Sequence, residues 1–97
     1  MSDKIQLLHP AGKHAVRMDK DKYDEISNAI LFCLKKGALT HKEMLEGINS
    51  DFKKNKIKFE GSVEWYMESV KLDLEAKKKV ERIKENSKLK FRLVRNL

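Results

Sequence analysis

The sequence predicts a single, mainly α-helical domain with a small β-hairpin, and three observations support this fold class. The chain has 97 residues, which is enough for one hydrophobic core but not for two. Only 4 glycines and 1 proline accompany 40% hydrophobic residues, a composition that favours helices over long loops. After Val80 the apolar residues stop recurring every three or four positions and begin to alternate, as they do in strands.

The N-terminal segment, residues 1–18, is predicted to be a short strand or an extended arm. Lys4–Leu8 is short and apolar, and it stops at Pro10–Gly12, where the residue types favour a turn. His9 and His14 flank this turn. Because no third ligand accompanies them, we expect no metal site there.

Three helices are expected within residues 19–80. The first begins at Asp19 or Asp21, either of which can cap a helix, and it runs to about residue 36. Its apolar face recurs at spacings of three and four and consists of Tyr23, Ile26, Ala29, Ile30, Cys33 and Leu34. The second helix begins after Thr40, because Thr40 and Glu43 have the spacing of a capping box. His41 would be its first residue.

The third helix and the C-terminal segment complete the domain. Ser62 is a good N-cap, and Val63–Val80 contains neither Gly nor Pro, so the third helix should be the longest. Residues 81–97 alternate in polarity around the polar turn Glu85–Lys88, which predicts a β-hairpin. An arm, three helices and a hairpin follow one another as in a winged-helix domain, where the hairpin is the wing. We therefore predict a winged-helix-like three-helix core with an N-terminal strand or arm.

The charge pattern identifies the hairpin as a candidate nucleic-acid-binding element. The chain has a net charge of +7, and residues 81–97 hold six basic and two acidic side chains. Clustered cations bind phosphates without reading the base sequence. The candidate residues are Lys84, Lys88, Lys90, Arg92 and Arg95. The alternative is a solvated strand face whose lysines oppose aggregation.

The third helix is apolar on two sides. Val63, Met67, Val70 and Leu74 share the face that should enter the core. Nearly opposite lie Trp65, Leu72 and Ala76, a candidate interaction surface that needs a cover. We favour the arm, through Ile5, Leu7 and Leu8, over a second copy of the chain or another protein.

The carboxylates of the third helix oppose a DNA-reading role for it. Glu64, Glu68 and Glu75 cluster beside the apolar faces, with Lys71 and Lys78 on the flank of the same strip. Phosphates repel carboxylates, and base edges require donors as well as acceptors. Insertion of this helix into the major groove is therefore disfavoured.

No sequence motif predicts a reaction, so we expect neither an enzyme nor a cofactor, metal ion or small-molecule substrate. Cys33, the only cysteine, excludes an internal disulfide and is expected to be a small buried residue. No apolar run approaches the roughly 20 residues that span a bilayer, and the N-terminus has no signal-peptide pattern. We expect a cytoplasmic protein without a membrane partner.

Two strings carry a resemblance to a known family. Gly61–Tyr66 (Gly-Ser-Val-Glu-Trp-Tyr) and Val70–Ala76 (Val-Lys-Leu-Asp-Leu-Glu-Ala), together with Ile5–Pro10, resemble a family of small uncharacterised bacterial proteins of winged-helix type. The resemblance covers nearly the whole chain and implies that fold, but no catalytic residue. The predicted function is a binding module for nucleic acid with little sequence specificity. The alternative is a protein-interaction or structural module, possible also as a homodimer, that uses Trp65 and Leu72.

Overall fold

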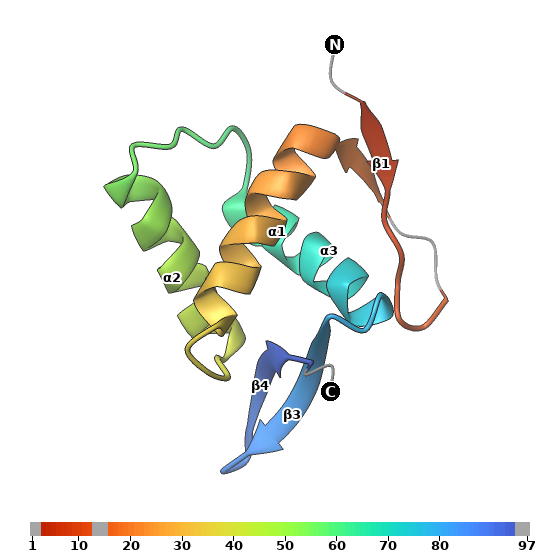
Figure 1. Cartoon of the computed structure of the whole chain (residues 1–97), viewed down its shortest axis with the longest axis vertical. Coiled ribbons are helices and arrows are strands. Elements are labelled where there is room, and N and C mark those ends of the chain that lie inside the picture. The colour runs from red at the N-terminus through yellow and green to blue at the C-terminus, as the bar shows by residue number, and fades with distance from the viewer. Residues whose placement is uncertain (1–2, 13–15, 95–97) are drawn as a thin grey trace.

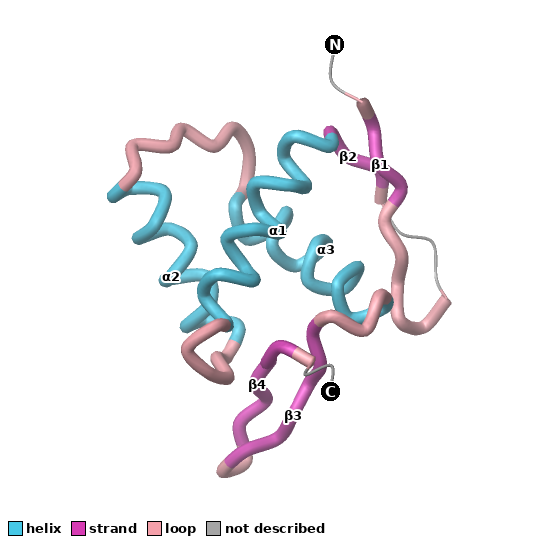
Figure 2. The backbone as a smooth tube through the Cα atoms, viewed as in Figure 1, coloured by secondary structure: helices cyan, strands magenta, loops and turns pink. Residues whose placement is uncertain are grey.

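The computed structural model describes residues 3–12 and 16–94, and helices dominate it (Figure 1). The elements, in chain order, are β1 (Lys4–Gln6), β2 (Arg17–Asp19), α1 (Lys20–Leu34), α2 (His41–Lys54), α3 (Val63–Ala76), β3 (Val80–Glu85) and β4 (Lys88–Leu93). The strands form two separate antiparallel pairs, β1 with β2 and β3 with β4 (Figure 2). The predicted order of arm, three helices and hairpin is confirmed.

The N-terminal arm is a small hairpin rather than a lone strand. β1 pairs with β2 so that Ile5 lies opposite Met18, and the Leu7 N–H donates to the Val16 carbonyl at 3.0 Å. Leu7 and Met18 are both buried. The sequence did not predict β2, because three residues are too few to show an alternating pattern.

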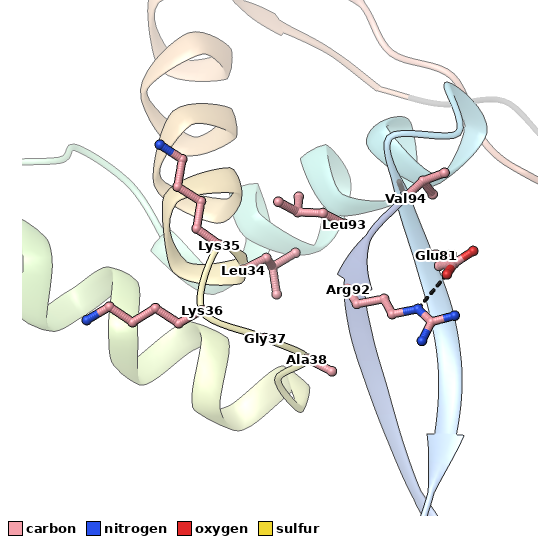
Figure 3. Close-up of a pocket in the computed structure, with 9 residues that line it drawn as sticks. All are labelled: Leu34, Lys35, Lys36, Gly37, Ala38, Glu81, Arg92, Leu93 and Val94. Atoms are coloured by element: carbon pink, nitrogen blue, oxygen red, sulfur yellow. Dashed lines mark hydrogen bonds and ion pairs between the residues drawn. The ribbon is translucent and has the colours of Figure 1, made fainter. Parts of the chain in front are cut away.

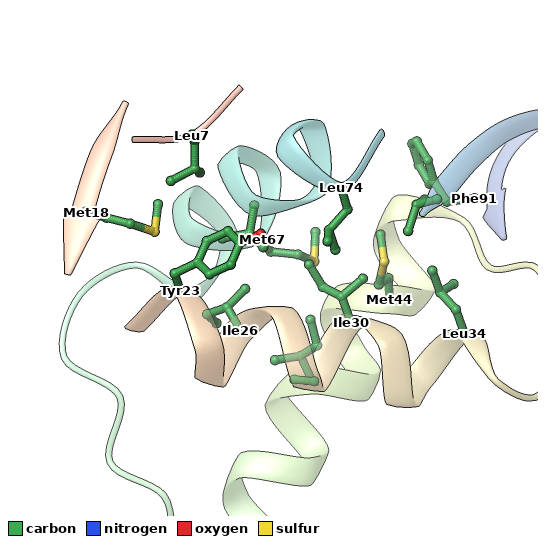
Figure 4. Close-up of a cluster of buried hydrophobic side chains, with 14 of the residues drawn as sticks. Leu7, Met18, Tyr23, Ile26, Ile30, Leu34, Met44, Met67, Leu74 and Phe91 are labelled. Atoms are coloured by element: carbon green, nitrogen blue, oxygen red, sulfur yellow. The ribbon is translucent and has the colours of Figure 1, made fainter. Parts of the chain in front are cut away.

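The three helices enclose one cluster of buried side chains (Figure 4). Its members come from both hairpins as well as from every helix: Leu7, Met18, Tyr23, Ile26, Ala29, Ile30, Leu34, Met44, Ile48, Phe52, Met67, Val70, Leu74, Val80 and Phe91. The predicted core face of α3 is confirmed for Met67, Val70 and Leu74, whereas Val63 is only partly buried.

Two of the predicted helix starts are confirmed in detail. The Thr40 hydroxyl accepts from the Glu43 N–H at 3.1 Å, and Glu43 Oε1 accepts from the Thr40 N–H at 2.9 Å, so the capping box is present. Ser62 caps α3 by accepting from the Trp65 N–H at 3.2 Å. Asp19 occupies the N-cap position of α1, and its carboxylate binds Lys4 Nζ at 2.5 Å.

The predicted length of the third helix is wrong. α3 ends at Ala76 and has 14 residues, one fewer than α1. Lys78 has φ 61°, a left-handed conformation that cannot continue a helix. The N–H groups of residues 77, 78 and 79 instead close the end of α3 by donating to the carbonyls of Asp73, Glu75 and Leu74.

The C-terminal hairpin projects from the helices and is fixed to them at its root (Figure 1). Asn86 and Ser87 both have positive φ, as a tight two-residue hairpin turn requires. Leu39, between α1 and α2, pairs with Phe91 through two backbone hydrogen bonds of 2.8 and 3.0 Å. Phe91 is buried, so the hairpin is anchored in the core while its turn is exposed. No helix in the described part of the chain is long and apolar enough to cross a membrane.

Candidate functional site

The basic residues of the hairpin lie on two faces and are partly neutralised. The register places Lys88, Lys90 and Arg92 on the same face as Glu81 and Glu85. Arg92 pairs with Glu81 at 2.5 Å, and Lys90 pairs with Glu85 at 2.9 Å. The hydrogen bond to Glu85 raises the pKa of Lys90. Both ion pairs are nevertheless at the surface.

Within the part of the chain that the structure describes, two lysines beside the hairpin turn are not ion-paired as Lys90 and Arg92 are. Lys84 and Lys88 are exposed, and neither forms an ion pair within residues 3–12 and 16–94. Arg82, on the Lys84 face, is held back against α3, where Glu75 accepts two hydrogen bonds from its guanidinium at 2.8 and 3.2 Å. Arg95, the last predicted candidate, lies outside the described residues. Lys84 and Lys88 thus both lie near the free end of the hairpin, on opposite faces.

A hollow of about 680 Å³ separates the hairpin from the end of α1 (Figure 3). Its walls are Leu34, Lys35, Lys36, Gly37, Ala38, Glu81, Arg92, Leu93 and Val94. In the view of Figure 3 the side chains of Lys35 and Lys36 extend away from the hairpin, whereas Arg92 and Glu81 are bound to each other on the opposite wall. Exposed cations therefore stand on both sides of this hollow.

The second apolar side of α3 is only half covered. The Trp65 side chain is 48% exposed, and Leu72 and Ala76 are half-buried. The Trp65 ring meets Tyr66 edge-on at 4.9 Å between centroids, and Tyr66 meets Phe59 in the same way at 5.0 Å. One edge of the indole is thus held by a row of aromatic rings, and the rest faces solvent.

The prediction that the arm covers Trp65 is wrong. Leu7 enters the core instead, Leu8 is exposed, and β1 lies against β2 and α1. The arm reaches α3 through a polar contact, in which the Leu8 N–H donates to Asp73 Oδ1 at 2.8 Å. An apolar pattern cannot reveal this anchor, because its acceptor is a carboxylate.

Asp73 belongs to a buried polar cluster that the sequence analysis missed. Its Oδ2 accepts from the Tyr23 hydroxyl and from Lys77 Nζ, the latter at 2.8 Å, while Lys77 Nζ also reaches the Tyr23 oxygen at 3.1 Å. Burial and the bond to Asp73 raise the pKa of Tyr23. Burial alone would lower the pKa of Lys77, but its bonds to Asp73 and Tyr23 outweigh burial and raise it. The four-residue spacing of Asp73 and Lys77 was the available signal.

A second charged cluster borders the exposed side of α3. His41, the first residue of α2 as predicted, places Nε2 at 3.0 Å from Glu64 and Nδ1 at 3.3 Å from Glu68. Glu68 also pairs with Lys71 at 2.9 Å. Lys71 was expected on a solvated flank, but it is buried and lies 4.2 Å above the centre of the Phe91 ring.

The other chemistry-bearing residues that the structure describes lie apart from one another. His9 Nδ1 accepts from the Ala11 N–H at 3.0 Å, and His14 lies outside the described residues. Cys33 is half-buried, and burial raises the pKa of its thiol. Across the residues that the structure places, no group of three His, Cys, Asp or Glu side chains could hold a metal ion.

A comparison with models of protein families matches almost the whole chain. Residues 4–91 match the model of a family of unknown function (DUF6958). The chain belongs to this family. A search of curated proteins and a search of solved structures each found no match. Membership of DUF6958 agrees with the predicted resemblance to an uncharacterised family, and it assigns no fold type, source or activity.

Proposed function

We propose that this DUF6958 member is a winged-helix-type module that binds nucleic acid through its C-terminal hairpin, with little dependence on base sequence. The order of elements supports the fold part of the proposal. A hairpin follows three helices, and Leu39, between the first two helices, pairs with β4 as an added strand position. In this arrangement β3 and β4 form the wing.

The observation that carries the proposal is the pair of lysines at the free end of the wing. Lys84 and Lys88 are exposed beside the projecting turn, and neither forms an ion pair in the described part of the chain. Lys90 and Arg92 follow Lys88 on one face of β4, opposite to the face of Lys84, and their ion pairs with Glu85 and Glu81 lie at the surface, where such pairs contribute little to stability. A phosphate could therefore replace either carboxylate at little cost.

The charge of α3 explains why the binding should be independent of sequence. Its solvent side presents Glu64 and Glu68, and Glu75 is bound to Arg82. Carboxylates next to a duplex repel its phosphates, so α3 is a poor reader of the major groove. Contacts from the wing to phosphates carry no sequence information, and their strength depends on salt.

The test measures salt dependence with matched charge removals. The first variant combines Lys84→Gln and Lys88→Gln, and its control combines Lys53→Gln and Lys54→Gln, two exposed lysines in the last turn of α2. Both variants lose the same net charge. Binding to two fluorescent duplexes of unrelated sequence is followed by anisotropy as a function of salt.

Each lost phosphate contact should reduce the slope of log K against log salt by about 0.9. We expect the wing variant to lose about 2 units of slope equally on both duplexes, and the control to keep the wild-type slope. Equal losses in the two variants would show that only net charge matters, and would refute the assignment to the wing. Absence of binding to any duplex at low salt would refute the function itself.

A further inference from the structure

The exposed side of α3 forms a straight apolar seam, which we define as Trp65, Leu72 and Ala76. The three residues occur at positions i, i+7 and i+11, which lie within about 20° of one line along a helix and span about 16 Å. The core residues Met67 and Leu74 occupy another side of α3. The seam is therefore apolar surface that the core of the chain does not use.

Leu8 is another exposed apolar residue, and its backbone is bound to α3. Its backbone N–H is fixed to Asp73, the residue that follows Leu72 in α3. Leu8 is 49% exposed. Large exposed apolar groups that gather on one surface mark interaction sites, whereas isolated ones need no explanation.

The border of the seam is acidic in a basic protein. Glu64 and Glu68 flank the seam, and the one basic residue of α3, Lys71, is buried, while the whole chain has a net charge of +7. The Glu64 side chain is 61% exposed, and Glu68 is nearly half exposed. A carboxylate has about four acceptor sites, so the contacts to His41 and Lys71 leave acceptor capacity facing solvent.

We propose that the seam is a docking surface for a basic amphipathic helix of another protein. The apolar side of that helix would pack on Trp65 and Leu72, and its Lys or Arg side chains would bind Glu64 and Glu68. A seam parallel to a helix axis suits a partner helix, because side-chain ridges of two helices interlock along their lengths.

Two other occupants fit the charges less well. Nucleic acid would bring its phosphates against the exposed carboxylates of Glu64 and Glu68. A second copy of the chain, docked through its own seam, would bring a second Glu64 and Glu68, and the one basic residue of its α3, Lys71, is buried. The inference uses residues apart from the wing lysines and stands independently of nucleic-acid binding.

The experiment selects partners from a displayed library of helical peptides against the full chain. Each peptide has leucines along one side and Lys, Gln or Glu at random on the two flanks of that side. We expect enrichment of Lys at the flanks. The affinity of an enriched peptide should fall at least about tenfold for Trp65→Ser, as expected for a central aromatic anchor, and by a smaller factor for Glu64→Gln.

Leu89→Ser provides the matched control, since Leu89 on the wing is also 48% exposed and should not contribute. Circular dichroism checks that each variant folds. If Trp65→Ser is unfolded, the measurement uses Ala76→Lys instead, which places a cation in the seam. No enrichment, enrichment of Glu or Gln, or an equal loss with Leu89→Ser would overturn the proposal. A wild-type dimer by sedimentation that Trp65→Ser converts to monomer would also overturn it, because a second copy would then occupy the seam.

Discussion

Replacing Asp73 by Asn should destabilise the protein strongly, because this carboxylate is fully buried and accepts from three donors on three segments. The donors are the Leu8 N–H of the arm, the Tyr23 hydroxyl of α1 and Lys77 Nζ after α3. An asparagine has nearly the same shape, but its amide group is a donor and must face at least one of these donors. The substitution therefore changes hydrogen bonding and charge with almost no change in packing.

The magnitude follows from what each partner loses. Breaking a buried ion pair from one side costs about 3–5 kcal/mol when the remaining charge stays buried. Lys77 is partly exposed and can turn towards water, which reduces that cost, whereas the Leu8 N–H and Tyr23 cannot move as freely. We expect a loss of about 3 kcal/mol in the free energy of unfolding. With a urea m-value of about 1.5 kcal/mol/M, the midpoint should fall by about 2 M.

The assay is urea unfolding followed by far-ultraviolet circular dichroism at neutral pH. Glu46→Gln is the control, because it removes one negative charge from an exposed position on α2. The free energy of unfolding of the control should differ from that of the wild type by less than about 0.5 kcal/mol. An Asp73→Asn midpoint equal to that of the control would refute the view that this cluster anchors the arm to α1 and α3.

Three further predictions concern stability. Thr40→Ala should cost about 0.5–2 kcal/mol through loss of the capping box, and an unchanged thermal midpoint would contradict this role. The pKa of Tyr23 is raised in the folded protein, so its contribution to the free energy of unfolding is complete below its unfolded pKa near 10 and is lost as pH rises through the folded pKa. Tyr23→Phe should therefore reduce the fall in stability above about pH 10. Parallel plots of stability against pH for wild type and variant would count against this role. Leu7→Ala should cost about 2–5 kcal/mol by leaving a core cavity, yet leave the native emission of Trp65 unchanged; a shifted emission would show that the arm covers the indole after all.

The features that could be predicted from the sequence are those set by neighbours in the chain. The capping box at Thr40 and the cap at Ser62 depend on groups three residues apart, so their residue types suffice to locate two helix starts. The C-terminal hairpin is predicted in the same way, from alternating polarity around a polar turn. The end of α3 was missed because no glycine marks it, and a lysine, Lys78, adopts the left-handed conformation instead.

The features that could not be predicted depend on pairs far apart in the chain. Tyr23 and Asp73 are 50 residues apart, and neither differs in the sequence from an ordinary helix residue. Lys71 resembles a solvated lysine until Phe91 folds beneath it. In the candidate site, the basic residues of the hairpin could be identified from the sequence. The pairing of Arg92 with Glu81 could not, because it depends on the strand register, which the turn at residues 86 and 87 fixes.

The junction between α3 and the wing shows how two surfaces of opposite charge can belong to one small domain. Phe91 lies between two cations, with Lys71 Nζ at 4.2 Å and the Arg82 guanidinium at 5.6 Å from its ring centre, and each cation is bound to a glutamate of α3. These contacts neutralise the charges where the two elements meet. The exposed charges that remain on these two elements include Glu64 on α3 and Lys84 and Lys88 near the hairpin turn. A polyanion would therefore be attracted to the hairpin and repelled by α3, whereas a basic helix would be attracted to α3, so the two proposed partners would not compete for one surface.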